Sequence, residues 1–320
     1  MPKLITGGLG FIGSHLARKL VYMGEEVILF DILTDSKLIS DLRHKVTVVR
    51  GDLGNQLEVM NLIKEYKVDT IFHTAALLSA SAELSPLTAY TINANGTLYI
   101  LEAARNFEVQ KVIFLSSIST YGPGVPDRVD DDTVQRPTTM YGVTKVISER
   151  LGEYYHVKFG LNFRGLRFPS IIGPGRGGGG ASAYSSLIVQ EPAAGRPYDV
   201  FVDEEAKIPL LYIEDAVQAM ISLENVPETN LKRRIYNIEG FSPTGYQLAA
   251  IVKKYIPSAQ IRFCPDAAMV QIVRSWPKEL DGSNARQDWG WQTKYDLDEA
   301  IRHFIKNFHE NEFLYGQVES

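Results

Sequence analysis

Tyr141 and Lys145 are the two residues of this chain best suited to move a proton, because they lie four positions apart. On a helix that spacing places both side chains on one face, one turn apart. A free tyrosine has a pKa near ~10 and is a poor base at neutral pH, whereas a neighbouring ammonium group favours the tyrosinate. Such a pair also occurs on ordinary helices. The prediction of a Tyr141 base tuned by Lys145 therefore depends on the residues around it.

A glycine-rich segment near the start of the chain is typical of a turn that binds phosphate groups. It follows an apolar stretch, precedes a helical pattern and reads Thr6-Gly7-Gly8-Leu9-Gly10-Phe11-Ile12-Gly13. Glycines allow a tight turn and a close approach of backbone to a pyrophosphate, which then faces the positive end of the helix. The alternative is a glycine-rich turn without a ligand, but the strand-to-helix context favours a dinucleotide. We therefore expect contacts to a dinucleotide from Gly7, Gly10, Phe11, Ile12 and Gly13.

Asp31 ends the second apolar stretch, about 20 residues further on, where an acid accepts hydrogen bonds from the adenosine ribose. Its charge would repel a 2′-phosphate, and no arginine follows it at residues 32–34. These features predict NAD rather than NADP, although a solvated acid at a strand end would look the same. Asp52 and Leu53, after the third strand, are expected to cover the adenine. Ala75 and Ala76, after the fourth, are expected to let the cofactor approach closely.

Ser117 and Asn93 complete the set of residues that could do chemistry. Ser117 ends the fifth apolar stretch, where its hydroxyl could hold the reacting oxygen. Asn93 would support the path of the proton through backbone or water. Lys145 could also hydrogen-bond the nicotinamide ribose. Together with the glycine-rich segment, these residues predict an enzyme that moves a hydride and a proton.

The elements that must position these residues alternate between short apolar runs and amphipathic stretches. Strands are expected at residues 4–6, 27–31, 46–50, 70–73, 112–116 and 162–168, and helices between them at 15–23, 57–66 and 87–107. This rhythm predicts an α/β fold, a Rossmann-type doubly wound parallel sheet with helices on both faces. Ligands of such sheets bind at the carboxyl ends of the strands, where the strand order reverses.

The rhythm breaks after residue 168. We interpret residues 1–168 as an NAD-binding Rossmann domain and 169–320 as a smaller, mixed substrate-binding domain, with 210–223 and 235–238 able to return to the main sheet. Residues 173–180 are rich in glycine and must form a loop. Whether Gly177–Gly180 closes as a lid stays open. The last four residues, 317–320, are expected to fray.

Composition excludes several other classes of protein. The chain has 320 residues, 45% of them hydrophobic, and a net charge of −5 without a long basic run. Nucleic acid and anionic membranes are therefore unlikely partners. Cys264 is the single cysteine, so no internal disulfide can form, and no signal or membrane-spanning segment is evident. These features favour the cytoplasm. The histidines lack metal-ligand spacing, so no metal is expected, and the acidic run 130–132 is interpreted as a solvated loop.

At these positions the chain resembles the extended short-chain dehydrogenase/reductase family, also described as NAD-dependent epimerases and dehydratases. The shared segments are the glycine run 6–13, Asp52-Leu53, Asn93-Ala94-Asn95-Gly96-Thr97, Ser116-Ser117, Tyr121-Gly122 and Tyr141 to Lys145. The resemblance covers nearly the whole chain. It implies NAD(P), a Rossmann domain and a homodimer that forms a four-helix bundle, here from helices around 93–107 and 140–159.

Within the family, the sequence is most similar to the short-chain-type L-threonine 3-dehydrogenases. The similar segments include 72–80, 139–145, 149–155, Leu166-Arg167-Phe168-Pro169 and a stretch from Ser275-Trp276-Pro277 to Trp291. The resemblance implies cofactor contacts from Phe168 and Pro169. Members that act on nucleotide sugars usually carry an arginine for the diphosphate, where this chain has the apolar Pro209-Leu210-Leu211. Arg176 or Arg196 could substitute for it.

The segment 181–185 departs from the threonine enzymes. They follow their glycine run with Thr-Thr-Asp-Tyr-Ala, whereas this chain has Ala-Ser-Ala-Tyr-Ser, which looks more like sugar-acid dehydrogenases of the D-erythronate type. An acid in this segment could hold an ammonium group or a lid. The expected substrate contacts are Ser79, Ser117, Tyr141, Ser182 and Trp276, although Ser79 and Ser182 could equally be loop serines and Trp276 a core aromatic.

Three hypotheses follow. The first is a cytoplasmic NAD-dependent dehydrogenase that oxidises a secondary hydroxyl of a small hydroxy-carboxylate, either L-threonine-like or a short sugar acid. The second is a nucleotide-sugar (UDP-sugar) 4-epimerase, which would keep its cofactor and release no NADH. The third is an NAD-sensing regulator without catalysis, which the intact Ser117, Tyr141 and Lys145 argue against.

Overall fold

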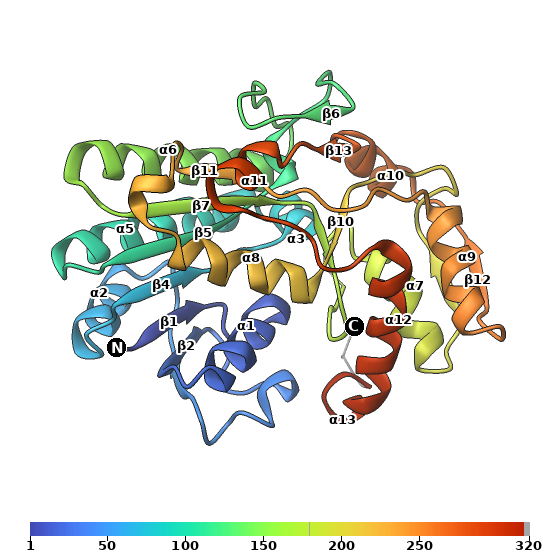
Figure 1. The fold of residues 1–320 in the computed structure, drawn as a ribbon, viewed down its shortest axis with the longest axis horizontal. Coiled ribbons are helices and arrows are strands. Elements are labelled where there is room, and N and C mark those ends of the chain that lie inside the picture. Colours follow the sequence, from blue (N-terminus) through green and yellow to red (C-terminus); the bar gives the residue numbers. More distant parts are fainter. Residues whose placement is uncertain (179, 317–320) are drawn as a thin grey trace.

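A parallel β-sheet forms the centre of the computed structural model, which describes residues 1–178 and 180–316 (Figure 1). Within these residues the sheet has seven strands in the order β11-β7-β5-β4-β1-β2-β3. Their bounds are β1 Lys3–Thr6, β2 Val27–Asp31, β3 Thr47–Arg50, β4 Thr70–His73, β5 Lys111–Ser117, β7 Phe163–Phe168 and β11 Ile235–Asn237. Each strand expected between residues 4 and 168 is present, with its ends shifted by at most one residue. The prediction of a Rossmann-type fold is confirmed.

The strand order reverses between β1 and β4, which is where the sequence places the glycine turn. β1 pairs with β2 on one side and with β4 on the other, in both cases parallel. Parallel strands buried on both faces must consist of nearly continuous apolar residues, and β2 and β4 are buried along almost their whole length. The carboxyl ends of β1, β2, β4 and β5 therefore open at one edge of the sheet.

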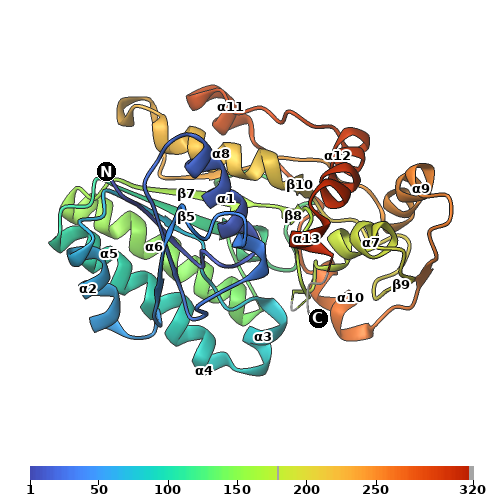
Figure 2. The ribbon, with the colours of Figure 1, turned by 90° about the horizontal axis from the view of Figure 1, so that it is seen from below.

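Helices cover both faces of the sheet (Figure 2). One face carries α1 (Phe11–Tyr22) and α8 (Ile213–Asn225), which contact each other. The other carries α2 (Gln56–Glu65), α5 (Gly96–Asn106) and α6 (Met140–Phe159), packed in that order. Helix α6 begins at Thr139, whose hydroxyl accepts from the N–H of Gly142, and ends at Gly160 in the left-handed conformation. These two end signals fix the helix that presents Tyr141 and Lys145.

The helix expected at 87–107 is interrupted. The chain instead forms α3 (Ser79–Leu84), α4 (Pro86–Ala89), a π-helical turn at Tyr90–Asn95 and then α5. The π turn carries Asn93, whose side chain bonds to the backbone of Leu77 on the neighbouring loop. Side-chain periodicity does not report such an insertion, because the helical pattern continues on both sides of it.

The remainder of the chain forms a smaller, mixed unit of short strand pairs and helices. The pairs are β8 (Ser170–Ile172) with β10 (Leu210–Tyr212), β9 (Tyr198–Val200) with β12 (Ile261–Phe263), and β6 (Arg128–Val129) with β13 (Glu279–Leu280). The helices are α7 (Tyr184–Ala193), α9 (Gly245–Tyr255), α10 (Ala267–Arg274), α11 (Ser283–Trp289), α12 (Leu297–Glu310) and α13 (Glu312–Tyr315). As expected, a later segment returns to the main sheet as β11, whereas β10 pairs with β8 instead. The predicted frayed tail, 317–320, lies outside the described residues.

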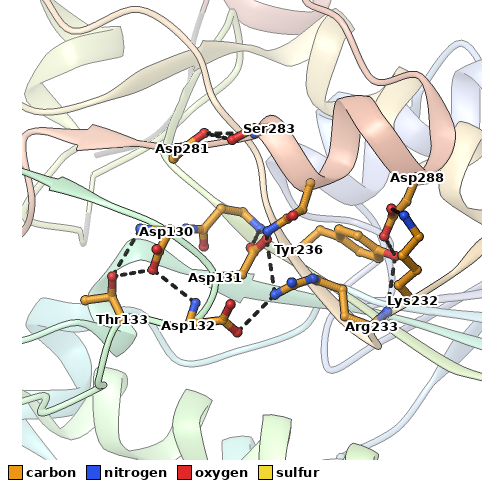
Figure 3. Close-up of polar contacts among 12 residues, drawn as sticks. Asp130, Asp131, Asp132, Thr133, Lys232, Arg233, Tyr236, Asp281, Ser283 and Asp288 are labelled. Atoms are coloured by element: carbon orange, nitrogen blue, oxygen red, sulfur yellow. Dashed lines mark hydrogen bonds and ion pairs between the residues drawn. The ribbon is translucent and has the colours of Figure 1, made fainter.

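The acidic run Asp130-Asp131-Asp132 is not simply a solvated loop, so that interpretation was wrong for its central residue (Figure 3). Asp131 is buried, and its carboxylate accepts from the backbone N–H of Asn237 in β11 and from Asn284 Nδ2 at 2.7 Å. The Arg233 Nη1 atom lies 3.6 Å from Asp131 Oδ2 and 3.1 Å from Asp132 Oδ1. The run therefore holds the loop before α6 against β11 and α11, which the spacing of three acids along the chain does not reveal.

None of the helices within the described residues is both long enough and apolar enough to cross a membrane.

Candidate active site

A cavity of about 580 Å³ opens at the carboxyl ends of the central strands. Every residue expected to bind the cofactor lines it: Gly7, Gly10, Phe11, Ile12, Gly13, Asp31, Asp52, Leu53, Ala75, Ala76, Tyr141, Lys145, Phe168 and Pro169. The expected substrate contacts line it too: Ser79, Ser117, Ser182 and Trp276. Asn93 alone of the expected catalytic residues is not part of the wall.

The glycine turn has the shape that the sequence predicts. Gly7 has a φ of +66°, in the left-handed region that glycine occupies without strain. A Cβ atom on Gly13 would collide with the carbonyl oxygen of Gly7, so the turn closes tightly only with glycine there. Gly10 precedes α1 and has no side chain to cap it. The first N–H groups of α1 therefore remain available to a phosphate at the positive end of the helix.

Asp31 lies at the end of β2, beside the glycine turn. Its carboxylate accepts from the backbone N–H of Leu9 at 3.1 Å and from that of Leu33 at 3.1 Å. These two bonds fix the carboxylate at the edge of the cavity while leaving further lone pairs for hydroxyl donors. The donor set and the shape of the turn both fit the ribose and pyrophosphate of NAD.

Tyr141, Lys145 and Ser117 meet at the inner wall of the cavity, from α6 and the end of β5. The Lys145 Nζ atom donates to the carbonyl oxygen of Leu115 at 2.6 Å and lies 5.6 Å from the centre of the Tyr141 ring. Ser117 Oγ accepts from the hydroxyl of Ser119 at 3.0 Å. A hydroxyl, a phenol and an ammonium group thus converge from two elements on one point of the wall.

Burial shifts the two titrating groups in opposite senses. It raises the pKa of Tyr141 to about 12, against the effects of a hydrogen bond with Ser117 and the charge of Arg176. It lowers the pKa of Lys145 to about 7, against the charge of Glu149. With these protein groups alone, a proton stays on Tyr141 at neutral pH. The lowering of its pKa that base chemistry requires stays a prediction for the enzyme with NAD bound.

Asn93 stands behind the wall. Its Oδ1 accepts from the N–H of Leu77 at 2.7 Å, while its Nδ2 donates to the Leu77 carbonyl oxygen at 3.0 Å and to Thr144 Oγ1 at 3.2 Å. Thr144 belongs to α6, between Tyr141 and Lys145. Asn93 therefore ties the helix that bears the catalytic pair to the loop after β4, through the Thr144 side chain and the Leu77 backbone. Its support of the proton path stays a prediction.

Glu149 and Arg167 were missed by the sequence reasoning. The Glu149 carboxylate is completely buried and accepts from Arg167 Nε at 2.9 Å and Nη2 at 2.8 Å, and also from the hydroxyl of Ser116. Its charge raises the pKa of Lys145. The available signal was the spacing, because residues 141, 145 and 149 recur every four positions on one helix face.

Ser79 and Ser182 are engaged by the glycine-rich segment itself. Ser79 Oγ accepts from the N–H of Ala181 at 3.2 Å, and Ser182 Oγ accepts from Arg176 Nη2 at 2.8 Å. Both serines are therefore loop-bonding residues that also face the cavity. The buried indole N–H of Trp276 has no hydrogen-bond partner among the described residues. Gly179, within the segment considered as a lid, lies outside the described residues.

Fold and site together define a Rossmann-type enzyme that binds NAD. Residues 3–238 match the NAD dependent epimerase/dehydratase family, and the chain belongs to that family. The mitochondrial L-threonine 3-dehydrogenase of Bos taurus is 34% identical over 319 residues, which cover 98% of this chain and 84% of that protein. These findings confirm the resemblance to the family and to its threonine dehydrogenases, and identify an NAD-dependent oxidoreductase.

Solved structures agree. The L-threonine dehydrogenase of Clostridium difficile is 36% identical, with a TM-score of 0.91 over 98% of both chains. The holo form of the GalE-like L-threonine dehydrogenase of Cupriavidus necator is 33% identical, with a TM-score of 0.90 over 96% of this chain and 100% of that one. The apo form of the same enzyme has a TM-score of 0.78.

Proposed function

We propose that this enzyme oxidises a secondary hydroxyl of a small hydroxy-carboxylate, L-threonine-like or a short sugar acid, with Tyr141 as the base. The observation that supports this most directly is the meeting of Ser117, Tyr141 and Lys145 in one cavity with the glycine turn and Asp31. NAD supplies C4 of its nicotinamide as the hydride acceptor when bound. The protein supplies position and proton transfer.

Each residue has a defined task in this proposal. The Ser117 hydroxyl holds the reacting oxygen of the substrate. Tyr141 takes the proton of that substrate hydroxyl as the C–H bond breaks and the carbonyl forms. Lys145 holds its ammonium near the phenol and favours the tyrosinate. The products are a ketone, NADH and a proton. Residues 1–168 would bind the cofactor and 169–320 would close the substrate side of the cavity, through Arg176, Ser182 and Trp276.

A nucleotide-sugar epimerase is less well supported. The apolar residues Leu210 and Leu211 stand where such enzymes usually carry a diphosphate-binding arginine, and both are buried in β10 rather than in the cavity wall. The relatives quoted above are named threonine dehydrogenases. Arg176 is the cation that could replace the missing arginine, because it does line the cavity.

The homodimer through a four-helix bundle also belongs to this proposal. Helix α6 exposes a row of apolar side chains on its outer face, including Tyr154, which is 55% exposed, and Val157, which is 84% exposed. A second copy of the chain would cover them. Light scattering should give twice the monomer mass, and Val157→Glu should shift it to the monomer. We propose the cytoplasm as the location, with neither nucleic acid nor a membrane as partner.

Tyr141→Phe tests the central claim. We expect turnover to be abolished while NADH still binds, because the ring and its packing remain and only the proton acceptor is lost. NADH absorbance reports turnover with NAD and a panel of L-threonine, short sugar acids and UDP-sugars. Tyr22→Phe, at the exposed end of α1 and away from the cavity, is the matched control and should remain active. Undiminished turnover by Tyr141→Phe would refute the assigned role.

A further inference from the structure

Arg176 is a cation without an anionic partner. Its Nη1 donates to Ser170 Oγ at 3.0 Å and to the Ile171 carbonyl oxygen at 2.6 Å, and its Nη2 donates to Ser182 Oγ at 2.8 Å. All three acceptors are neutral, and no carboxylate within residues 1–178 and 180–316 forms an ion pair with it. A guanidinium has five N–H donors, so these contacts leave two unused.

The charge of this guanidinium is therefore not neutralised by the fold. The charge of Arg167, nine positions earlier, is neutralised within the fold, because its guanidinium is buried against the Glu149 carboxylate at 2.8 Å. Withdrawal from water lowers the pKa of Arg176 to about 10, which is the sign of a charged form that lacks compensation. The side chain is half-buried and lines the cavity, so an anion can reach it.

The position of Arg176 suits a group beside the reacting carbon. Arg176 and Tyr141 line the same cavity, and the charge of Arg176 lowers the pKa of Tyr141. A Cβ atom on Gly180 would lie 3.7 Å from Arg176 Nη2, and glycine leaves that space open. The unpartnered indole N–H of Trp276 adds a second buried donor in the same wall.

Among the described residues that line the cavity, none at the Arg176 end is acidic. The acids in the described wall are Asp31, the last residue of β2, and Asp52, which follows β3. In the sheet β2 is three strands from β5, so at about 4.8 Å per strand Asp31 stands about 14 Å from Ser117. An ammonium group on the substrate would find the charge of Arg176 nearby but no carboxylate.

We propose that Arg176 binds the carboxylate of the substrate and that the cavity selects hydroxy-acid anions over zwitterionic amino acids. This inference rests on the proposed dehydrogenase function and narrows its substrate class. The carboxylate takes the two unused N–H donors, and a hydroxyl replaces the ammonium group at the neighbouring carbon. A single guanidinium matches one negative charge better than the two of a diphosphate.

Three substrates of one shape separate the charges: 2,3-dihydroxybutanoate is an anion, L-threonine a zwitterion and butane-2,3-diol neutral. We expect the enzyme to prefer the anion over L-threonine by at least about 10-fold in kcat/KM. Arg176→Gln should raise KM for the anion by about 10- to 100-fold, the range for a hydrogen bond to a charged group. Its effect on the diol should be small, because the diol has no carboxylate.

The matched control is Arg196→Gln, since Arg196 is exposed and already pairs with Glu191 at 2.6 Å. It should leave all three substrates unchanged. An equal loss on anion and diol in Arg176→Gln would mean that Arg176 only supports the loop, which would overturn the proposal. A preference for L-threonine over the anion would overturn the selectivity, as would KM values that Arg176→Gln does not change.

A binding measurement separates this inference from the proposed function. Calorimetry with 2,3-dihydroxybutanoate and NADH, which cannot accept a hydride, detects binding of the carboxylate in Tyr141→Phe without turnover. Adding Arg176→Gln should weaken that binding by the same factor of about 10 to 100. Turnover by Tyr141→Phe would refute the base while leaving this result readable. Binding of UDP-glucose but not of the carboxylate would overturn the assignment of Arg176.

Discussion

Replacing Lys145 with methionine should raise the pH at which the enzyme becomes active by about two units. The Lys145 Nζ atom lies 5.6 Å from the centre of the Tyr141 ring. Taken as the separation of the two charges, that distance gives an interaction of about 3 kcal/mol at an effective dielectric constant of about 20. This corresponds to about 2 pKa units on the phenol. Methionine keeps the unbranched, apolar stem and removes the ammonium group, with its charge and its hydrogen bond to the Leu115 carbonyl oxygen.

The same substitution should change how stability depends on pH. Burial lowers the pKa of Lys145 from 10.5 to about 7, so between these values the unfolded chain binds more protons than the folded protein. The free energy of unfolding therefore rises with pH across this window, because the cost of burying the charge disappears as the lysine loses its proton. Below pH 7 the full cost is present. Lys145→Met should abolish that rise.

Two assays check the two effects. The pH dependence of kcat/KM should show the acid limb of Lys145→Met about two units higher, with a rate below it about 100-fold lower. Urea unfolding at pH 7 and pH 10, without added nucleotide, reports the stability term. Lys145→Arg is the control that keeps a charge. An unchanged acid limb in Lys145→Met, with NADH affinity intact, would show that the ammonium does not tune Tyr141.

Two further substitutions test the cofactor end and the support of the site. Asp31→Asn should weaken NAD binding by about 10-fold. It should also narrow the difference in affinity between NAD and NADP, because the amide no longer repels a 2′-phosphate. Titrations with NADH and NADPH measure both affinities, and an unchanged NADPH affinity would contradict the prediction. Glu149→Gln should destabilise the fold by about 3–5 kcal/mol, since it leaves Arg167 buried without its counter-charge. Chemical denaturation measures that loss of unfolding free energy, and a loss below about 1 kcal/mol would contradict the ion-pair account. Glu149→Gln should also lower the pKa of Lys145, so that the pH range in which stability rises begins at a lower pH.

The sequence predicts the fold and the gathering of the site because both follow from local patterns. Continuous apolar runs give buried parallel strands, and their carboxyl ends must share one edge of the sheet. Asp31, Ser117 and the glycine turn therefore had to lie along one edge of the sheet once the strands were identified. The four-residue spacing of Tyr141 and Lys145 likewise places both side chains on one face of α6.

Other features depend on contacts between distant segments, which spacing does not report. Asp131 looked like one of three solvated acids, but β11 brings the N–H of Asn237 onto it from 106 positions away. Asn93 lies on an unexpected π turn and faces Leu77 rather than the cavity. Ser79 accepts from the backbone of Ala181, 102 positions along the chain. Each of these roles is decided by the partner, and the partner is known only from the fold.

Arg167 and Arg176 show that the role of a charged residue depends on the partner that the fold brings to it. Arg167 and Arg176 are separated by nine positions in one segment, and nothing in their residue type distinguishes them. The first is neutralised by Glu149 and so contributes to the fold and to the pKa of Lys145. The second meets only neutral acceptors among the described residues, so its charge remains available to a ligand. A buried cation is structural where the fold provides its counter-charge. Arg176 is only half-buried and has no such counter-charge among the described residues, and we propose that the substrate supplies it.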